Sequence, residues 1–128
     1  MAQLSQGAAG EIAAARFLRE RGYTVISSNY RCRQGEIDII VSDERHIVFV
    51  EVKTRRAGSL YTPREAVTAA KQRRLVATAG VFLSHHPLAL QPRFDVIEVV
   101  TGDRDPFSIV EINHIQSAYE TGDLSRSF

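Results

Sequence analysis

The chain has 128 residues, of which 44% are hydrophobic and 24% charged, the balance of a soluble domain with one sizeable core. No apolar run approaches the roughly 20 residues needed to cross a bilayer, and the N-terminus lacks the basic start and apolar centre of a secretion signal. We therefore expect a single domain, residues 1–128, that stays in the cytoplasm and contacts no membrane. The single Cys32 excludes an internal disulfide and argues against a structural zinc site.

The net charge of +1 argues against a general polyanion binder, but the charge is unevenly distributed. Residues 1–94 carry 14 of the 16 basic and 8 of the 15 acidic side chains, whereas residues 95–128 carry 2 and 7. The densest basic stretch, residues 53–74, has seven basic side chains and one acidic side chain. Such a concentration is typical of a surface that meets phosphates. The alternative is an ordinary solvated face.

The first half of the chain predicts one helix followed by three strands. Residues 7–21 are rich in alanine and precede Gly22, which predicts a helix with a glycine at its end. Residues 23–29 predict a strand. Residues 36–42 and 46–54 predict two more, joined by the polar connection "SDER" that suits an antiparallel hairpin.

A second helix is predicted for residues 62–83. Three signals mark its start: Thr62 as the N-cap, Pro63 at the first helical position, and Glu65 where a capping box has its acidic residue.

Two strands are predicted after this helix, at residues 93–100 and 107–115, and a short terminal helix is an open alternative for the last residues. The order α-β-β-β-α-β, with an added strand, predicts an α/β fold with a central sheet flanked by helices. The sheet should be mixed, because short turns link the first three strands while a helical crossover leads to the fourth.

Charged residues interrupt the apolar hairpin "GEIDIIVSDERHIVFVEVKTR". Residues two apart on a strand share a face, so Glu51 and Lys53 should project together. A hairpin that turns between Glu44 and Arg45 places Asp38 opposite Glu51, with Cβ atoms roughly 5 Å apart. Two carboxylates this close repel each other and raise a pKa unless a cation neutralises them.

Two interpretations of these charges are open. Lys53 between Asp38 and Glu51 would form a plain salt bridge on a solvated sheet face. However, the charges follow β-branched residues, as in "IVFVEVK", so a covered sheet becomes polar only near its strand end, where α/β sheets commonly hold their chemistry. Two carboxylates suit Mg²⁺ or Mn²⁺ rather than zinc, and a lysine beside them would serve metal-assisted phosphodiester hydrolysis.

The motifs "GEIDII" and "VFVEVKTR" resemble the Asp…(Asp/Glu)-x-Lys signature of the restriction-endonuclease-like nuclease superfamily, and more narrowly its Holliday-junction-resolvase-like members. The similarity extends through "EAVTAAKQRRL" and "RFDVIEV", and the whole chain is similar to the bacterial YraN-type endonuclease-like family. This resemblance implies a restriction-endonuclease-like core, with Asp38 and Glu51 as metal ligands and Lys53 as the catalytic lysine. Ile37 stands where the wider motif has proline, a departure common among resolvase-like members.

Two helix residues are further candidates for the catalytic site. Glu11 matches the place where resolvase-like nucleases carry an extra metal-site carboxylate; the alternative is a solvated helix glutamate. Gln72 is expected on the core side of its helix, where its amide would bond to a substrate phosphate or to a metal-bound water. Related nucleases often carry a lysine or glutamine on this helix.

Arg55, Arg56, Lys71 and Arg74 are the candidates for contact with the nucleic-acid backbone, and a solvated helix flank is the alternative for the last two. Arg93 and Asp95 are expected to form a local pair or to be structural fixtures, and the resemblance leaves a role in lining the site open. The four histidines are expected to be non-catalytic, because no two of them have the spacing of metal ligands on one face.

The sequence therefore predicts an Mg²⁺- or Mn²⁺-dependent endonuclease acting on structured or branched DNA. The rival prediction is a nucleic-acid-binding module of the same fold without catalysis, and a third is an interaction protein with an ordinary charged sheet. A homodimer is the assembly to test, because a four-way junction presents two equivalent strands.

Overall fold

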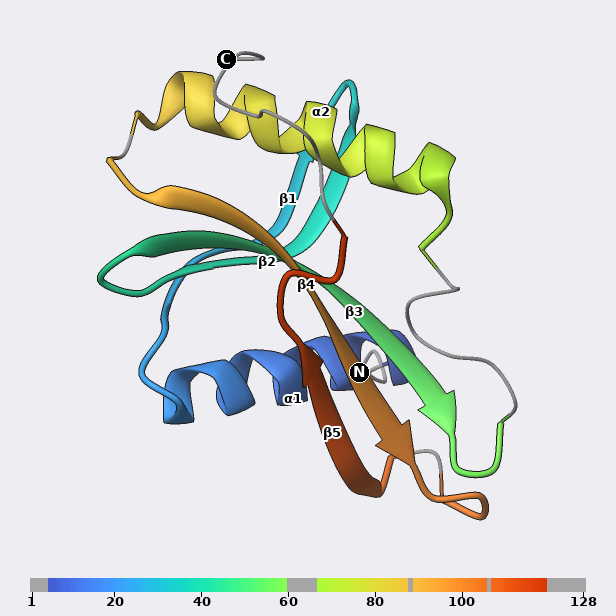
Figure 1. The fold of residues 1–128 in the computed structure, drawn as a ribbon. Helices are drawn as coiled ribbons and strands as arrows, with labels where there is room; N and C mark the ends of the chain where they lie inside the picture. The colour runs from blue at the N-terminus through green and yellow to red at the C-terminus, as the bar shows by residue number, and fades with distance from the viewer. Residues whose placement is uncertain (1–4, 60–66, 88, 106, 120–128) are drawn as a thin grey trace.

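The computed structural model describes residues 5–59, 67–87, 89–105 and 107–119 (Figure 1). Within this part of the chain the elements are α1 (Gln6–Glu20), β1 (Thr24–Cys32), β2 (Gly35–Ser42), β3 (His46–Arg56), α2 (Ala69–His85), β4 (Gln91–Thr101) and β5 (Ile109–Ile115). The order confirms the predicted α-β-β-β-α-β core with an added strand, and the fold is α/β of the restriction-endonuclease-like type.

The five strands form one sheet in the order β1-β2-β3-β4-β5. Strands β3 and β4 are parallel and every other neighbouring pair is antiparallel, so the predicted mixed sheet is confirmed. The parallel pair arises because α2 carries the chain back across the sheet between β3 and β4, a connection that a short turn cannot make.

Helices α1 and α2 cover opposite faces of the sheet (Figure 1). Alternate residues of β3 serve the two faces: Val48 and Val50 pack with the α1 side, and Phe49 packs with the α2 side. Neither helix is long and apolar enough to cross a membrane.

Helix α1 begins and ends as the sequence predicts. The Ser5 hydroxyl accepts a hydrogen bond from the Ala8 N–H at 3.0 Å, and the chain leaves the helix through Gly22, whose φ of 92° favours glycine. Gly10 lets the helix approach β3 closely, because a Cβ atom at this position would overlap Thr54 Oγ1. This close approach brings the first half of α1 to the edge of the candidate site.

The predicted start of α2 is wrong. The helix begins at Ala69, and Thr68 is its N-cap, with a hydroxyl that accepts from the Lys71 N–H at 3.2 Å. Val67 is buried in the core under α2 and precedes the extended Thr68, so these two residues, which lie inside the predicted helix, are not helical. Thr62, Pro63 and Glu65 lie outside the described residues, as does most of the segment for which a terminal helix was open.

Candidate active site

The candidate site lies where β2 and β3 separate. Their pairing runs from Ser42–Ile47 to Ile39–Val50, which confirms the register predicted from the turn. Beyond that point β2 remains paired with β1 as far as Gly35, while β3 remains paired with β4 as far as Arg56. In Figure 1 the β1–β2 hairpin reaches toward α2 as β3 continues past α1, so the sheet opens into a fork.

Asp38 occupies the fork. Its Oδ2 accepts a hydrogen bond from the Val52 N–H of the opposite strand at 2.8 Å, so the carboxylate takes the place of a backbone carbonyl in the interrupted ladder. The predicted cross-strand pair of Asp38 and Glu51 is therefore not part of the ladder, which ends one residue earlier. The physical reason is the strand divergence, which the hydrophobic pattern of a hairpin does not reveal.

Three carboxylates nevertheless meet around this fork. A pocket of about 350 Å³ is lined by Glu11, Asp38 and Glu51, with Gly7, Val52 and Thr54 completing its wall. Burial raises the pKa of Asp38 to about 8, helped by the negative charges of Glu51 and Glu11 and opposed by the Val52 N–H. Asp38 is only 8% exposed, so at neutral pH it holds a proton in the metal-free protein.

Two lysines hold the Glu51 carboxylate from two different elements. Lys53 Nζ lies 3.2 Å from Glu51 Oε1, and Lys71 Nζ, from the first turn of α2, lies 2.7 Å from the same oxygen. The Glu51 side chain is 8% exposed, whereas those of Lys53 and Lys71 are 22% and 32% exposed. The ion pair that was one of the two sequence interpretations is therefore present, with a second lysine added.

Lys71 is the site residue that the sequence analysis placed elsewhere, among the nucleic-acid contacts. A compositional signal points to it: the chain has only two lysines against fourteen arginines, and both lysines contact Glu51. A lysine ammonium is a compact point charge on a flexible stem, whereas arginine presents a planar fork. The chain uses arginine for its other basic side chains and lysine at this one carboxylate.

The two lysines differ in how firmly they hold their protons. Burial lowers the pKa of Lys71, but its hydrogen bond to Glu51 and the attraction of the nearby carboxylates outweigh burial and raise it. For Lys53, burial and the neighbouring Lys71 ammonium outweigh the attraction of Glu51, so its pKa is lowered.

The carboxylates do not form a finished metal site in this arrangement. Within the described part of the chain, no three His, Cys, Asp or Glu side chains are grouped so that they could hold one ion. The donors are nonetheless hard oxygen ligands, the kind that Mg²⁺ and Mn²⁺ prefer. A cation at the fork would have to exchange with the lysines on Glu51 and with the proton on Asp38.

The remaining candidates lie around the fork with different partners. Gln72 donates from Nε2 to the Val67 carbonyl at 3.0 Å, so its amide braces the start of α2 beside Lys71. Arg55 donates from Nε to the buried Glu98 at 2.7 Å.

The exposed basic candidates are Arg56, at the end of β3, and Arg74, which lines a shallow groove with Gln34 and Arg73. Of the four residues predicted to contact nucleic acid, these two thus present exposed side chains, whereas Arg55 and Lys71 hold carboxylates.

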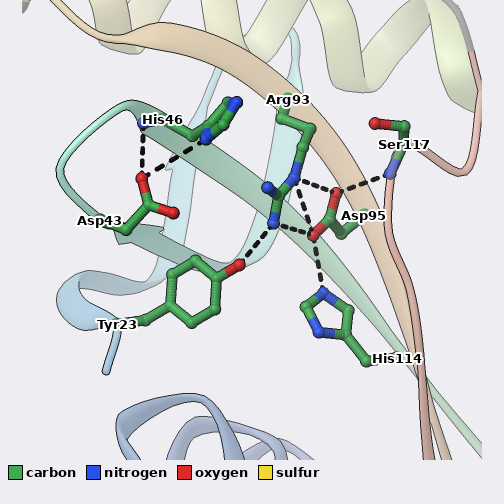
Figure 2. A network of polar contacts seen from close by, with 7 residues as sticks. All are labelled: Tyr23, Asp43, His46, Arg93, Asp95, His114 and Ser117. Carbon is green, nitrogen blue, oxygen red and sulfur yellow. Dashed lines mark hydrogen bonds and ion pairs between the residues drawn. The ribbon is translucent and has the colours of Figure 1, made fainter. Parts of the chain in front are cut away.

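Asp95 belongs to a separate buried network near the start of β4 (Figure 2). It is fully buried and accepts hydrogen bonds from Arg93 Nη2 at 2.8 Å and from the Ser117 N–H at 3.0 Å. Arg93 also donates to the Tyr23 hydroxyl at 2.7 Å, and His114 Nε2 lies 2.7 Å from the Asp95 carboxylate. The predicted local pair of Arg93 and Asp95 is confirmed as a structural fixture.

The partners of Asp95 come from distant parts of the sequence, and sequence spacing gave no sign of His114 or Tyr23. Burial raises the pKa of Asp95, but the hydrogen bonds from His114, Arg93 and Ser117 outweigh it and hold this pKa below its usual range. The network fastens β4, β5 and the turn after β5 to the residue that precedes β1.

Comparison with known proteins places these residues in a family. The model of the "Uncharacterised protein family UPF0102" matches residues 10–99, which include every residue of the fork. The chain belongs to the UPF0102 family. This is the YraN-type family that the sequence resemblance indicated, and it is of the restriction-endonuclease-like type.

UPF0102 proteins from distant bacteria align with nearly the whole chain. The chain is 50% identical to a UPF0102 protein of Symbiobacterium thermophilum over 116 residues, which cover 88% of this chain and 94% of the relative. It is 43% identical to a UPF0102 protein of Chlorobium phaeobacteroides over 119 residues, which cover 90% of this chain and 94% of the relative. It is 40% identical to one of Caldanaerobacter subterraneus over 114 residues, which cover 88% of this chain and 93% of the relative.

Proposed function

We propose that this UPF0102 protein is a divalent-metal-dependent endonuclease that hydrolyses phosphodiester bonds in structured or branched DNA. The observation that carries the proposal is the fork between β2 and β3, where three carboxylates line one pocket and both lysines of the chain contact one of them. Burial and the neighbouring carboxylates raise the pKa of Asp38, and raised pKa values of this kind are characteristic of functional sites.

Glu11, Asp38 and Glu51 would hold Mg²⁺ or Mn²⁺, and the ion would supply positive charge at a phosphate oxygen and a bound water of lowered pKa. The chain's own residues prepare this binding. The Val52 N–H fixes the Asp38 carboxylate in the fork, and the close packing at Gly10 holds the helix turn that bears Glu11 against the sheet. Asp38 must lose its proton for the cation to bind, so affinity for the metal should increase with pH up to about 8.

Lys53 is the residue placed to act on the phosphate. Its ammonium group lies beside Glu51 on the same strand face, and an ammonium has no lone pair with which to ligate a metal. It would instead neutralise the charge that develops on the scissile phosphate or orient the attacking water. Gln72 lies on α2 beside Lys71. Its side-chain amide donates a hydrogen bond to the Val67 carbonyl and so braces the turn that carries Lys71.

DNA would reach the site along exposed basic side chains at the end of β3 and on α2, represented by Arg56 and Arg74. Arg55 and Lys71 each already hold a carboxylate, Glu98 and Glu51. Paired cuts in a branched substrate would require two copies of the chain related by a two-fold axis, because each copy contributes one fork.

The second candidate function is a nucleic-acid-binding module of the same fold without catalysis. One observation favours it: the Glu51 carboxylate already contacts two ammonium groups, so it has counterions without a metal. Such a protein would bind branched DNA equally well with and without divalent cations.

Cleavage assays with forked, flapped, four-way-junction and plain duplex DNA, in Mg²⁺, in Mn²⁺ and in a chelator, separate the two candidates. We expect metal-dependent cleavage of the branched substrates by the wild type. Lys53→Met should reduce this cleavage by about 10²-fold or more while DNA binding falls only modestly, because it removes a contact that matters in the transition state.

The matched control is Glu36→Gln, which removes a charge from an exposed residue of β2 that pairs with Arg31. It should cleave as the wild type does. A wild type that binds these DNAs tightly but cuts none of them, with either metal, would instead establish the binding module.

A further inference from the structure

Lys71 occupies an electrostatically unusual position. It lies in the first turn of α2, which contains no acidic residue, and its own N–H is capped by Thr68. The N-terminus of a helix carries partial positive charge, so a cation in the first turn is disfavoured and an anion is favoured. The ammonium group of Lys71 is therefore stabilised by its 2.7 Å contact with Glu51 rather than by its own helix.

The same contact occupies Glu51 Oε1, one of the two oxygens with which this carboxylate could ligate a metal ion. Glu51 Oε1 is shared by Lys53 and Lys71, and a divalent cation that binds this carboxylate must compete with both ammonium groups. Lys53 projects from β3, which is paired with β4. In this pairing Lys53 lies opposite Glu98. Lys71 is the more exposed of the two and reaches Glu51 from α2, so it is the one that solvent or a ligand can reach more easily.

We propose that Lys71 couples the two ligands of this site: in the free protein it neutralises Glu51, and a nucleic-acid phosphate draws it away so that Glu51 becomes available to a divalent cation. The inference rests on the proposed function in requiring both a phosphate ligand and a cation at the fork. Lys71 is then a positioning residue. It keeps the acidic pocket neutral until substrate arrives.

Thermodynamic linkage makes this coupling measurable from either side. If DNA releases Glu51 from Lys71, DNA must increase the affinity for the cation, and the cation must increase the affinity for DNA by the same factor. Couplings between sites are commonly of the order of 5- to 150-fold, and loss of one of two ammonium competitors places the expected effect at about tenfold. A lysine with only a structural role would change stability but not the coupling factor.

The test uses Lys71→Gln and Lys71→Met, two uncharged variants of different polarity, so that the reasoning does not depend on one variant's folding. Mn²⁺ affinity without DNA is measured by calorimetry. The affinity for a fluorescent, hydrolysis-resistant phosphorothioate fork is measured by anisotropy in a chelator and in saturating Mn²⁺. The ratio of the two DNA affinities is the coupling factor, and Mn²⁺ binding to the DNA alone is subtracted.

Both variants should bind Mn²⁺ about tenfold more tightly than the wild type in the absence of DNA, and their coupling factor should fall toward one. The matched control is Arg73→Gln, which removes an exposed positive charge from the same helix. It should weaken DNA binding through lost phosphate attraction and leave both Mn²⁺ affinity and the coupling factor unchanged.

The outcomes distinguish this inference from the proposed function. If the wild type binds Mn²⁺ and the fork but both Lys71 variants keep its Mn²⁺ affinity and coupling factor, the inference is overturned while the proposed function stands. A wild type that binds no Mn²⁺ overturns the inference and the metal-dependent function together.

Discussion

Replacing Asp38 by Asn should stabilise the metal-free protein at neutral pH. The folded state raises the pKa of this carboxyl from 3.8 to about 8, so between these values the folded protein holds a proton that the unfolded chain has lost. The contribution of Asp38 to the free energy of unfolding is fully present below pH 3.8 and falls as the pH rises toward 8. Asn keeps an oxygen that can accept from the Val52 N–H and removes the ionisation.

The magnitude follows from linkage. Each pH unit in this window costs about 1.4 kcal/mol, which gives about 4 kcal/mol at pH 7 as an upper bound for complete burial of the group. Glu36→Gln, on the same strand but exposed, should show no comparable change because its carboxylate remains solvated.

The assay is urea unfolding of wild type and both variants at intervals from pH 4 to pH 8. The difference between Asp38→Asn and wild type should grow with pH, and every group shared by the two proteins cancels from it. Saturating Mn²⁺ should make the wild type the more stable of the two proteins. The ion stabilises the folded wild type by binding to it, and it has one ligand fewer in the variant. Two parallel stability curves would refute the reasoning, since they would mean that Asp38 ionises normally in the fork.

Three further predictions concern the support of the site. Gly10→Ala should lower the free energy of unfolding by about 1–3 kcal/mol and weaken Mn²⁺ binding, because its Cβ would overlap Thr54 Oγ1 of β3 and displace the turn of α1 that bears Glu11, whereas Arg16→Ala, an exposed change on the same helix, should do neither. Asp95→Ala should cost about 3–5 kcal/mol, because the part-buried Arg93 loses its counterion, and it should leave Mn²⁺ affinity at the fork unchanged; a loss below 1 kcal/mol would contradict the network's role. Mn²⁺ binding at pH 7 should release about one proton from Asp38, measured by calorimetry in buffers of different ionisation heat, and a proton count of zero would contradict the raised pKa.

The parts of the fold that depend on neighbouring residues were predictable from the sequence. Helix α1 ends at Glu20, just before Gly22, whose backbone conformation favours glycine, and the register of β2 and β3 is set by their short turn and by alternation of apolar side chains. The pairing of Glu51 with Lys53 follows in the same way, since residues two apart on a strand share a face.

Local signals were insufficient where packing sets a helix start and where the chain departs from regular pairing. The described structure starts α2 after the extended Thr68, which follows Val67 in the core, although the local sequence predicts a helix through both residues. The fork at Asp38 is equally invisible in the alternation of the hairpin. It arises because β2 follows β1 while β3 follows β4, a choice made by partners that are distant in sequence.

The sequence by itself determined which side chains are candidates for the site, and the tertiary structure decided which partners they contact. Hydrophobic periodicity and spacing singled out Asp38, Glu51 and Lys53, because these depend on the geometry of one hairpin. The contact of Lys71 with Glu51 depends on how α2 lies across the sheet, and the raised pKa of Asp38 depends on burial by several elements together. Electrostatic energies are set by distance and by exclusion of water, and both become defined only when the chain has packed.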